Sequence, residues 1–528
     1  MMSRPFATEA LAQIPKILTL QDRNPHSPTY GCFDRNFWQY KIIDFPSGMA
    51  QEFVLPLALA YSLPIPDNPY YQQLALRRWI VAGMHYAARS AHKDGSCDDY
   101  FPFERAGGAA AFSLLACLDS YTLLKLEDPL LLQFFEKRAD WLAHHQESGR
   151  LTNHQALIAL CLALAGQRLH TDRWQQAQQV RLEQVLSWQN PEGWFQEYEG
   201  FDPGYQTLTI GCLARLYDMQ PSAPLKDAIA KAVLLVAHFI HPDGSYGGEY
   251  TSRNTYNFFP HGFERVGRWL PEALSINDKF LQGLAEGQGS CYADDHIVGH
   301  HTWSYLQAWQ DFVKARPGVP LPKGRLWLPE ARILVERQGD TTLYVALNKG
   351  GAFKLFRGDR LVVSDTQVSL QVRTGGGVKN AVGHLVGHYP IQVEEGKISI
   401  SGSLGWAKQT QMTPSKLMVL RLVTLSVGRF FPNLVRRILQ KVLITGKTAA
   451  PFQFERRFEW QGQWRITDRV TSDAWQNVVA AGIAPDQTSI YVVMSRTYQA
   501  GQLQPWLNLT EQVRSLKPGE PLVVERSL

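Results

Sequence analysis

Long uninterrupted hydrophobic runs are absent from this chain of 528 residues. A helix that crosses a bilayer needs about 18 apolar residues in a row, and even the stretch 109–118 is only as long as a helix in a protein core. The first ten residues also lack the continuous apolar region and the small-residue cleavage site of a secretory signal. We therefore predict a cytoplasmic protein without a transmembrane segment.

Cysteine is scarce and follows no pattern. The six cysteines are scattered without any C-x-x-C spacing, and Cys117, Cys161 and Cys212 fall within apolar helical patterns. Paired spacings would indicate a disulfide framework or a metal site. Their absence favours buried free thiols in a reducing compartment.

Charged residues are also few, at 19% against 45% apolar residues. The 53 Lys and Arg minus the 48 Asp and Glu leave a net charge of only +5. The apolar content excludes intrinsic disorder, and the small net charge argues against a nucleic-acid partner. A local basic groove for an acidic ligand remains compatible with this small net charge. The length corresponds to two or three domains.

Two different periodicities meet at the proline-rich stretch 316–326. Before it, apolar residues recur at helical spacing and predict about ten helices stacked as hairpins. After it, short runs between turn signals predict a mostly antiparallel β-sandwich. The predicted helices are 51–62, 72–90, 107–126, 130–145, 153–166, 171–188, 205–219, 224–240, 263–285 and 298–315, and the predicted strands are 331–337, 341–347, 352–356, 360–363, 397–403, 452–460, 489–495 and 522–525.

Residues 417–444 interrupt the second pattern. Their spacing of basic among apolar residues is compatible with a basic amphipathic helix. Packing of the apolar face on the β-sandwich is the favoured interpretation, because the run contains Pro432 and sits inside one domain. Peripheral contact with a membrane surface is the alternative. The basic residues are Arg421, Arg429, Arg436, Arg437 and Lys441.

Three loops between predicted helices resemble one another, at 94–101, 192–198 and 243–250. Each has an acid followed by Gly, a few residues, and then an acid beside or near Tyr. Equivalent loops of a helical repeat project from one end, so we expect them to line one opening. Acid and aromatic pairs suit a sugar-binding cleft, although ordinary turns and buried tyrosines are the alternative. The substrate-binding candidates here are Asp99, Tyr100, Trp194, Glu197, Tyr198, Glu249 and Tyr250.

Asn153 and His154 open one predicted inner helix, and Tyr205 opens the next. A helix N-terminus favours an anion, and a Tyr close to cationic groups can exchange protons with a sugar oxygen. Helix capping and core packing are the alternatives.

The stretch 250–264 is rich in polar and aromatic residues without regular periodicity, which is typical of a binding loop. Its candidates are Arg253, which can clamp a carboxylate, Tyr256 and His261, which can transfer protons, and Asn254 and Glu264. Further on, His296 and His300 have a spacing that suits two metal ligands, but no third ligand is evident, and we predict no metal.

Three motifs together, Asn153-His154, the loop Gly193-Trp-Phe-Gln-Glu-Tyr with Gly204-Tyr205, and Asn348-Lys-Gly-Gly-Ala-Phe-Lys-Leu-Phe, make the chain resemble the heparinase II/III-like polysaccharide lyases and related toroid-type alginate lyases. The resemblance spans most of the chain. It implies a multidomain α+β fold, with an incomplete (α/α) toroid over 1–320 and an antiparallel β-sandwich over 321–528 that carries the helical insertion near 417–444.

The resemblance also implies roles for residues. Asn153 and His154 would neutralise a uronate carboxylate, Tyr205 would transfer protons, and Arg253, Tyr256 and His261 would assist. The expected reaction is β-elimination in an anionic polysaccharide or oligosaccharide, which needs no metal or organic cofactor. Two alternatives stay open, a glycoside hydrolase that uses paired carboxylates on the same toroid and a non-catalytic glycan-binding protein of polysaccharide biosynthesis. The carboxylates available to a hydrolase are Asp98, Asp99, Glu197, Asp202 and Glu249.

Overall fold

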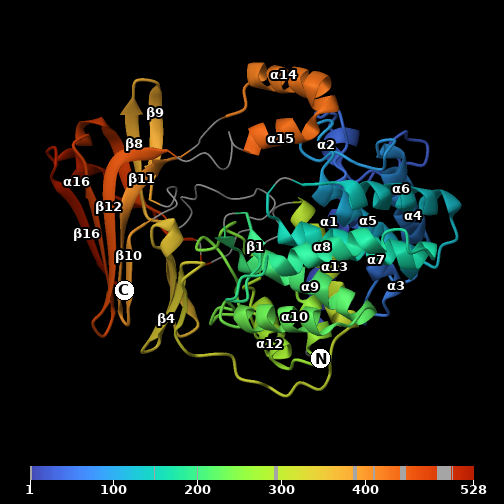
Figure 1. Cartoon of the computed structure of the whole chain (residues 1–528), viewed down its shortest axis with the longest axis horizontal. Helices are drawn as coiled ribbons and strands as arrows, with labels where there is room; N and C mark the ends of the chain where they lie inside the picture. The colour runs from blue at the N-terminus through green and yellow to red at the C-terminus, as the bar shows by residue number, and fades with distance from the viewer. Residues whose placement is uncertain are drawn as a thin grey trace.

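The computed structural model describes residues 3–147, 149–198, 200–289, 295–383, 389–407, 411–440, 448–484, 501 and 503–528. Helices gather at one end of the molecule and sheets at the other (Figure 1). The chain is thus a mixed helical and sheet protein, with its helices mostly in the first part and a large sheet region in the second. The strand predicted at 489–495 lies outside the described residues.

Six of the described helices form an inner ring. Each contacts the next, and the last contacts the first. The longer ones are apolar almost all round, because they are covered both by the ring and by an outer layer. In order they are α3 (Val54–Ser62), α5 (Gly107–Leu123), α7 (Thr152–Leu169), α9 (Pro203–Met219), α11 (His261–Val266) and α13 (Asp295–Gln310).

An outer helix packs on each inner one, α4 on α3, α6 on both α5 and α7, α8 on α7, α10 on α9, α12 on α11, and α1 on α13. The prediction of one helix over 263–285 is wrong, because the chain breaks between Gly267 and Pro271 into α11 and α12. The bounds are α1 (Arg4–Leu20), α4 (Leu74–Ser90), α6 (Pro129–His144), α8 (Gln175–Ser187), α10 (Ala223–Val236) and α12 (Glu272–Ala285), with the short α2 (Arg35–Trp38) and the 3-10 helix η1 (Met49–Phe53) near the first inner helix.

The three similar loops share one turn geometry. Gly95, Gly193 and Gly244 all adopt positive φ, of 89°, 99° and 79°. The backbone N–H of each donates to the carbonyl three residues earlier. A Cβ at any of the three would lie 2.6 to 2.9 Å from the backbone of the following outer helix. Glycine is therefore required at each turn, both for its conformation and for its close approach.

The described residues of the second part of the chain form two antiparallel sheets. The smaller runs in sequential order through β3 (Leu326–Leu328), β4 (Ile333–Gln338), β5 (Thr341–Ala346), β6 (Ala352–Arg357) and β7 (Arg360–Asp365). The larger has the order β15-β14-β8-β9-β11-β12-β13-β16, with β10 beside β11. Its strands are β8 (Val368–Thr374), β9 (Gly377–Val382), β10 (Ile391–Glu394), β11 (Lys397–Trp406), β12 (Ala449–Trp460), β13 (Trp464–Thr471), β14 (Val478–Ile483), β15 (Leu507–Asn508) and β16 (Pro521–Ser527), and α16 (Thr510–Arg514) lies between the last two.

The smaller sheet lies between the helices and the larger sheet (Figure 1). Successive side chains of a strand point to opposite faces. On β5, Leu343 and Val345 enter the core shared with the larger sheet, whereas Tyr344 and Ala346 enter the core shared with the helices. Both faces are therefore buried, which explains why every residue of this strand is buried and why apolar and charged residues do not alternate along it.

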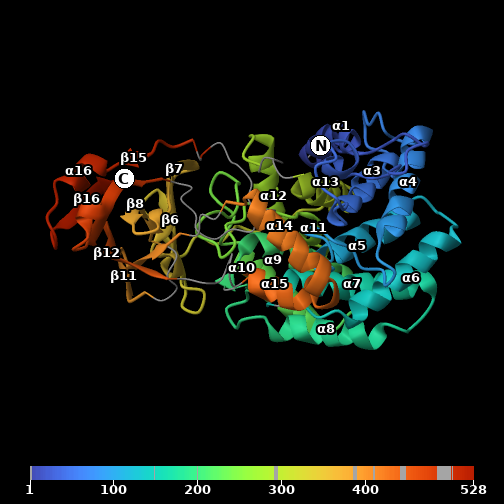
Figure 2. The same cartoon turned by 90° about the horizontal axis from the view of Figure 1, so that it is seen from above.

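The helical insertion comprises α14 (Pro414–Val423), the π-helical turn η3 (Thr424–Gly428) and α15 (Pro432–Gln440). The favoured prediction, that its apolar face packs on the sheets, is wrong. Both views place it over the helical half, beside α2 in Figure 1 and across the inner helices in Figure 2. Arg421 forms an ion pair with Asp44 there, and most of the apolar side chains of the insertion are exposed.

The described cysteines, Cys32, Cys97, Cys117, Cys161 and Cys212, are free and buried. Burial raises the pKa of the Cys117 thiol to about 12, so that thiol stays protonated and unreactive at neutral pH. The prediction of buried free thiols is confirmed for these five, and Cys291 lies outside the described residues.

Candidate active site

Asp202 holds the start of α9 and the loop 251–255 together. As the N-cap of α9, its carboxylate accepts a hydrogen bond from the backbone N–H of Tyr205 at 3.0 Å, and Pro203 occupies the first helical position. The same carboxylate accepts bonds from the Thr251 hydroxyl at 2.8 Å, the Arg253 backbone N–H at 3.1 Å and the Thr255 hydroxyl. The cap thereby places Arg253 next to Tyr205.

Glu197 is the centre of a buried polar cluster. It accepts 2.8 Å hydrogen bonds from both the backbone N–H and the side-chain amide of Asn153, at the start of α7. Arg253 forms an ion pair with the same carboxylate at 3.4 Å. Burial raises the pKa of Glu197, and the Arg253 charge and the Asn153 bonds oppose that rise.

Arg253 packs on two tyrosines. Its guanidinium carbon lies 3.8 Å from the ring centroid of Tyr205 and 4.9 Å from that of Tyr198. Burial disfavours the charge, but Tyr205, Tyr198 and Glu197 outweigh burial and raise the pKa of Arg253. The guanidinium is therefore charged at every physiological pH. This cation lies directly against the ring of Tyr205, the residue predicted from the sequence to transfer protons.

His154 lies beside this cluster and has its own carboxylate. Its Nδ1 is 2.8 Å from Glu147, whose side chain is buried, whereas the imidazole is 17% exposed. The first turn of α5 comes so close that a Cβ at Gly108 would lie 2.7 Å from the ring. The Asn153-His154 pair is thus flanked by two buried carboxylates. Sequence reasoning missed Glu147, which precedes α7 in a loop without a distinctive pattern.

A second cluster joins the loop 249–256 to the sheets. Lys354 on β6 lies 3.8 Å from the carboxylate of Glu249 and 4.5 Å from the ring centroid of Tyr256. Burial lowers the pKa of Lys354, and Glu249 opposes that effect. Lys349 donates a 2.6 Å hydrogen bond to Asn254. Sequence reasoning overlooked both lysines, although a Lys inside the apolar run Phe353-Lys-Leu-Phe signals a buried partner.

Four other residues predicted to bind substrate, Tyr250, Trp194, Asp99 and Tyr100, lie outside these two clusters. The Tyr250 hydroxyl meets His241 at 2.9 Å within the core shared with the sheets. The Trp194 indole donates to Glu192, whose carboxylate also accepts from the backbone N–H of Glu330. Asp99 accepts a bond from Ser47, and Tyr100 is exposed. These side chains support the loops and the boundary between helices and sheets.

The structure separates His261 and Glu264 from this cluster. His261 meets Asp311 at 2.8 Å and lies in the electrostatic field of Arg215, which is ten residues further along α9 than Tyr205, or about 15 Å of helix. Glu264 is buried and bonded to Asn277 and Arg316. Both residues hold helices together at a distance from the Tyr205 ring. They belong to α11, which begins at His261, after the loop 251–255 that contains Arg253.

Among the described residues, no group of three side chains is arranged to hold a metal ion. His300, one of the two spaced histidines, bonds Glu52 at 2.6 Å and stacks on Phe112 with 4.1 Å between ring centroids. The side chain of His296 lies outside the described part.

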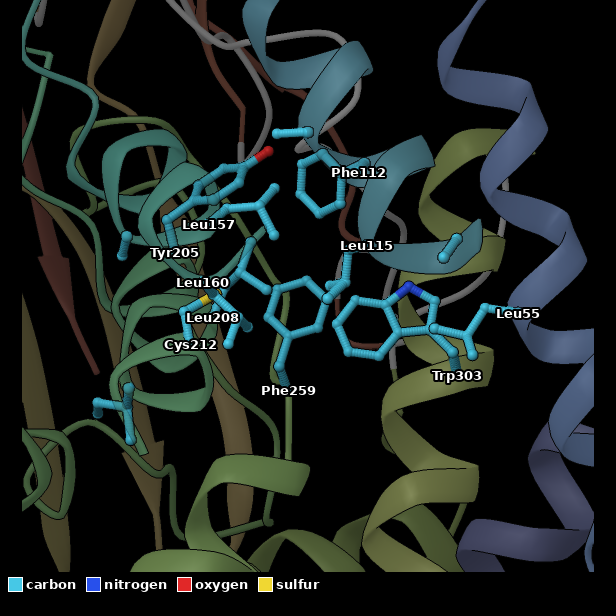
Figure 3. Close-up of a cluster of buried hydrophobic side chains, with 14 of the residues drawn as sticks. Leu55, Phe112, Leu115, Leu157, Leu160, Tyr205, Leu208, Cys212, Phe259 and Trp303 are labelled. Carbon is cyan, nitrogen blue, oxygen red and sulfur yellow. The ribbon is translucent and has the colours of Figure 1, made fainter. Parts of the chain in front are cut away.

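Tyr205 lies at one end of the apolar interior of the helix ring. In Figure 3 its ring contacts the cluster beside Leu157 and Phe112, and its hydroxyl oxygen points to the edge of the cluster. Leu208 and Cys212, on the same face of α9, continue the apolar wall toward Phe259. The phenol is thus fixed by packing on one side and by Arg253 on the other.

No family model matches the chain, and the search of curated proteins gives no match. Solved structures similar to it include a heparan sulfate lyase mutant from Pedobacter heparinus, at 14% identity over 92% of this chain and 70% of that one, with a TM-score of 0.44. An unsaturated glucuronyl hydrolase mutant from Streptococcus agalactiae matches at 11% identity over 59% and 91%, with a TM-score of 0.41. A β-L-arabinofuranosidase from Geobacillus stearothermophilus T6 matches at 10% identity over 99% and 97%, with a TM-score of 0.38. Such likenesses identify neither the reaction nor the substrate of this chain.

Proposed function

We propose that this chain processes an acidic glycan, cutting it by β-elimination at a uronic acid next to Tyr205. Two observations support an (α/α) toroid followed by a β-sandwich as its architecture. The inner helices contact one another in a closed ring, and two antiparallel sheets follow them. The observation that carries the proposal is the contact of the Arg253 guanidinium with the Tyr205 ring, in a cluster that also contains Asn153.

In the proposed reaction, Arg253, Asn153 and His154 hold the uronate carboxylate and stabilise the negative charge that develops when C5 loses its proton. Tyr205 accepts the C5 proton and delivers a proton to the glycosidic oxygen on C4. The C4–O bond breaks and a C4=C5 double bond forms, so no net proton is gained or lost by the protein. Glu197 positions Asn153 and Arg253, and Glu147 positions His154.

The test is incubation of the full chain with heparan sulfate, alginate and glucuronan. A lyase generates unsaturated ends that absorb in the near ultraviolet. We expect Tyr205→Phe to lower the rate at least about 100-fold while glycan binding is retained, because the substitution removes only the proton carrier. Tyr217→Phe is the matched control, since this half-buried Tyr on the same helix packs against Trp269, away from the cluster. Absence of unsaturated product on every polymer would refute the lyase.

A hydrolase is the second candidate, favoured by one observation. Glu147 and Glu197 are both buried carboxylates on either side of Asn153-His154, and burial raises the pKa of Glu197 as a general acid requires. Release of reducing sugar without unsaturation, abolished by Glu197→Gln, would support this reaction.

A glycan-binding protein without turnover is the third candidate. Glu197 already accepts from the Asn153 amide and pairs with Arg253, two donors that a substrate carboxylate would use. Saturable binding of an acidic glycan, with no product of either kind, would support this function.

A further inference from the structure

The hairpin made by α14, η3 and α15 exposes a large apolar surface. Phe430 is 73% exposed and Leu422 is 66% exposed, and both lie among other exposed apolar residues. Thr424, Gly428 and Val435 fill the inside of the hairpin, where a Cβ at Gly428 would lie 3.4 Å from Val435. The larger apolar side chains are thus left outside. An exposed apolar surface of this extent marks an interaction site.

The charge of this region is of one sign only. Residues 396–454 contain nine Lys and Arg and no Asp or Glu. Since the whole chain has 53 basic and 48 acidic residues, the remainder has 44 and 48, a net charge of −4. The hairpin is therefore the centre of a basic segment on an otherwise slightly acidic protein. This combination of apolar and basic side chains is complementary to a surface that is both apolar and negatively charged.

Two basic side chains fasten the hairpin to the helical half. Arg421 lies 2.9 Å from the carboxylate of Asp44 and 5.4 Å from the ring centroid of Phe45, and Arg429 lies 5.4 Å from that of Phe103. Ile42 and Tyr100, close in sequence to these contacts, are also exposed. The attachment therefore leaves the apolar side chains free and extends the apolar surface onto the neighbouring loops.

We propose that this hairpin is an interfacial anchor that seats the protein on an anionic phospholipid bilayer. Among the described helices, none has the length and apolar character needed to cross a membrane. The hairpin instead lies in the plane of the interface, with Phe430, Phe431 and Leu422 in the acyl boundary and Lys416, which takes no part in the attachment to the helical half, at the phosphates.

The anchor is mounted at the end of the helical half that contains the candidate active site. Phe103 precedes the start of α5 at Gly107, and the next residue, Gly108, lies against His154. Seated on a bilayer, the protein holds this end close to the lipid surface. The proposal does not depend on the chemistry at Tyr205, and its test involves no glycan.

The experiment is flotation of the full chain with two kinds of vesicle, phosphatidylcholine alone and phosphatidylcholine mixed with an equal part of phosphatidylglycerol. We expect binding to the mixed vesicles only, weakening as salt is raised. Phe430→Ser with Phe431→Ser should weaken binding at least about tenfold, because two large apolar groups leave the lipid. Lys416→Glu should weaken it at least about fivefold, since each basic residue near the surface contributes about that factor.

Leu74→Ser with Leu130→Ser is the matched control. Both side chains are exposed on outer helices, at 71% and 65%, so binding should be unchanged. Equal binding to both kinds of vesicle, or binding to neither, overturns the proposal. Self-association that the two Phe substitutions abolish, without vesicle binding, would assign the surface to a second copy of this chain and would also overturn it.

Discussion

His241 shows how a single buried residue links the two parts of the chain. Its Nδ1 lies 2.8 Å from the Ser245 hydroxyl and its Nε2 lies 2.9 Å from the Tyr250 hydroxyl. Its ring also packs against Tyr344 and Phe356, which come from the smaller sheet. Burial, with the positive charge of Lys354, lowers the pKa of His241 well below its ordinary value. The folded protein therefore keeps this ring neutral.

The stability of the protein should consequently depend on pH through His241. Between the ordinary histidine pKa of about 6.5 and the lower folded value, the unfolded state binds more protons than the folded state. The free energy of unfolding should therefore fall as the pH is lowered below about 6.5. Urea unfolding at a series of pH values measures this slope. In His241→Gln the slope should be shallower, whereas substitution of the exposed His26 by Gln should leave it unchanged, and equal slopes in all three proteins would contradict the assignment.

At the scale of elements, the repeated turn sets the geometry of the helical half. Asp94 and Asp243 each accept bonds from the backbone N–H and the hydroxyl of the Ser two residues later, so these acids shape the turn. The three turns lead from an outer helix to an inner one, from α4 to α5, from α8 to α9 and from α10 to α11. The inner helix α7 also follows an outer helix, α6, so α5, α7 and α9 begin at one end of the ring. The starts of α7 and α9 carry Asn153 and Tyr205, and this explains why residues 52 positions apart belong to one cluster.

The close approach of α5 and α7 predicts an unusual effect of Gly108→Ala. A methyl group there would lie 2.7 Å from the His154 ring, so the ring must shift from the position in which its Nδ1 meets Glu147. Alanine is favoured over glycine in a helix by up to about 1 kcal/mol, so the melting temperature should not fall. We expect glycan turnover or binding to drop at unchanged stability. Gly211→Ala is the control, since its Cβ would be 3.9 Å from the nearest atom. A loss of stability without loss of activity would contradict this account.

At the scale of the whole molecule, the smaller sheet is part of two cores. The residues on one face of β5 pack with the larger sheet, and those on the other pack with the helices. Glu192 adds a polar link, because its carboxylate accepts from the backbone N–H groups of Glu330 and Ala331. The domain boundary predicted between residues 320 and 321 is thus followed by a sheet that packs extensively against the helices.

We therefore expect the two parts to unfold together. Leu343→Ala removes a side chain from one core and Tyr344→Ala removes its neighbour from the other. Each should lower the free energy of unfolding by about 2–5 kcal/mol, through lost burial and the cavity left behind. Differential scanning calorimetry should show one transition that both substitutions shift. Two transitions, each sensitive to only one substitution, would show instead that helices and sheets are independent units.

Much of the local structure was predictable from the sequence, because it is encoded in periodicity. Nearly all the long inner and outer helices begin and end within a few residues of the predicted ranges, and the strands β4, β5, β6, β7, β11, β12 and β16 coincide with predicted runs. The helix α1 was not predicted, because Pro15 interrupts its apolar stripe and a proline inside such a pattern normally breaks a helix. Strands such as β9 and β10 were missed because they have few apolar residues.

By itself, then, the sequence determined the type and order of the elements and the glycines of the repeated turn, since these depend on residues close together in the chain. Only the tertiary structure decided which distant side chains meet. It brought Glu147 to His154 and Lys354 to Glu249, separated His261 from Tyr205, and left the apolar side of the α14 and α15 hairpin uncovered. Such outcomes depend on how whole helices and sheets pack, and no local pattern of residues specifies that packing.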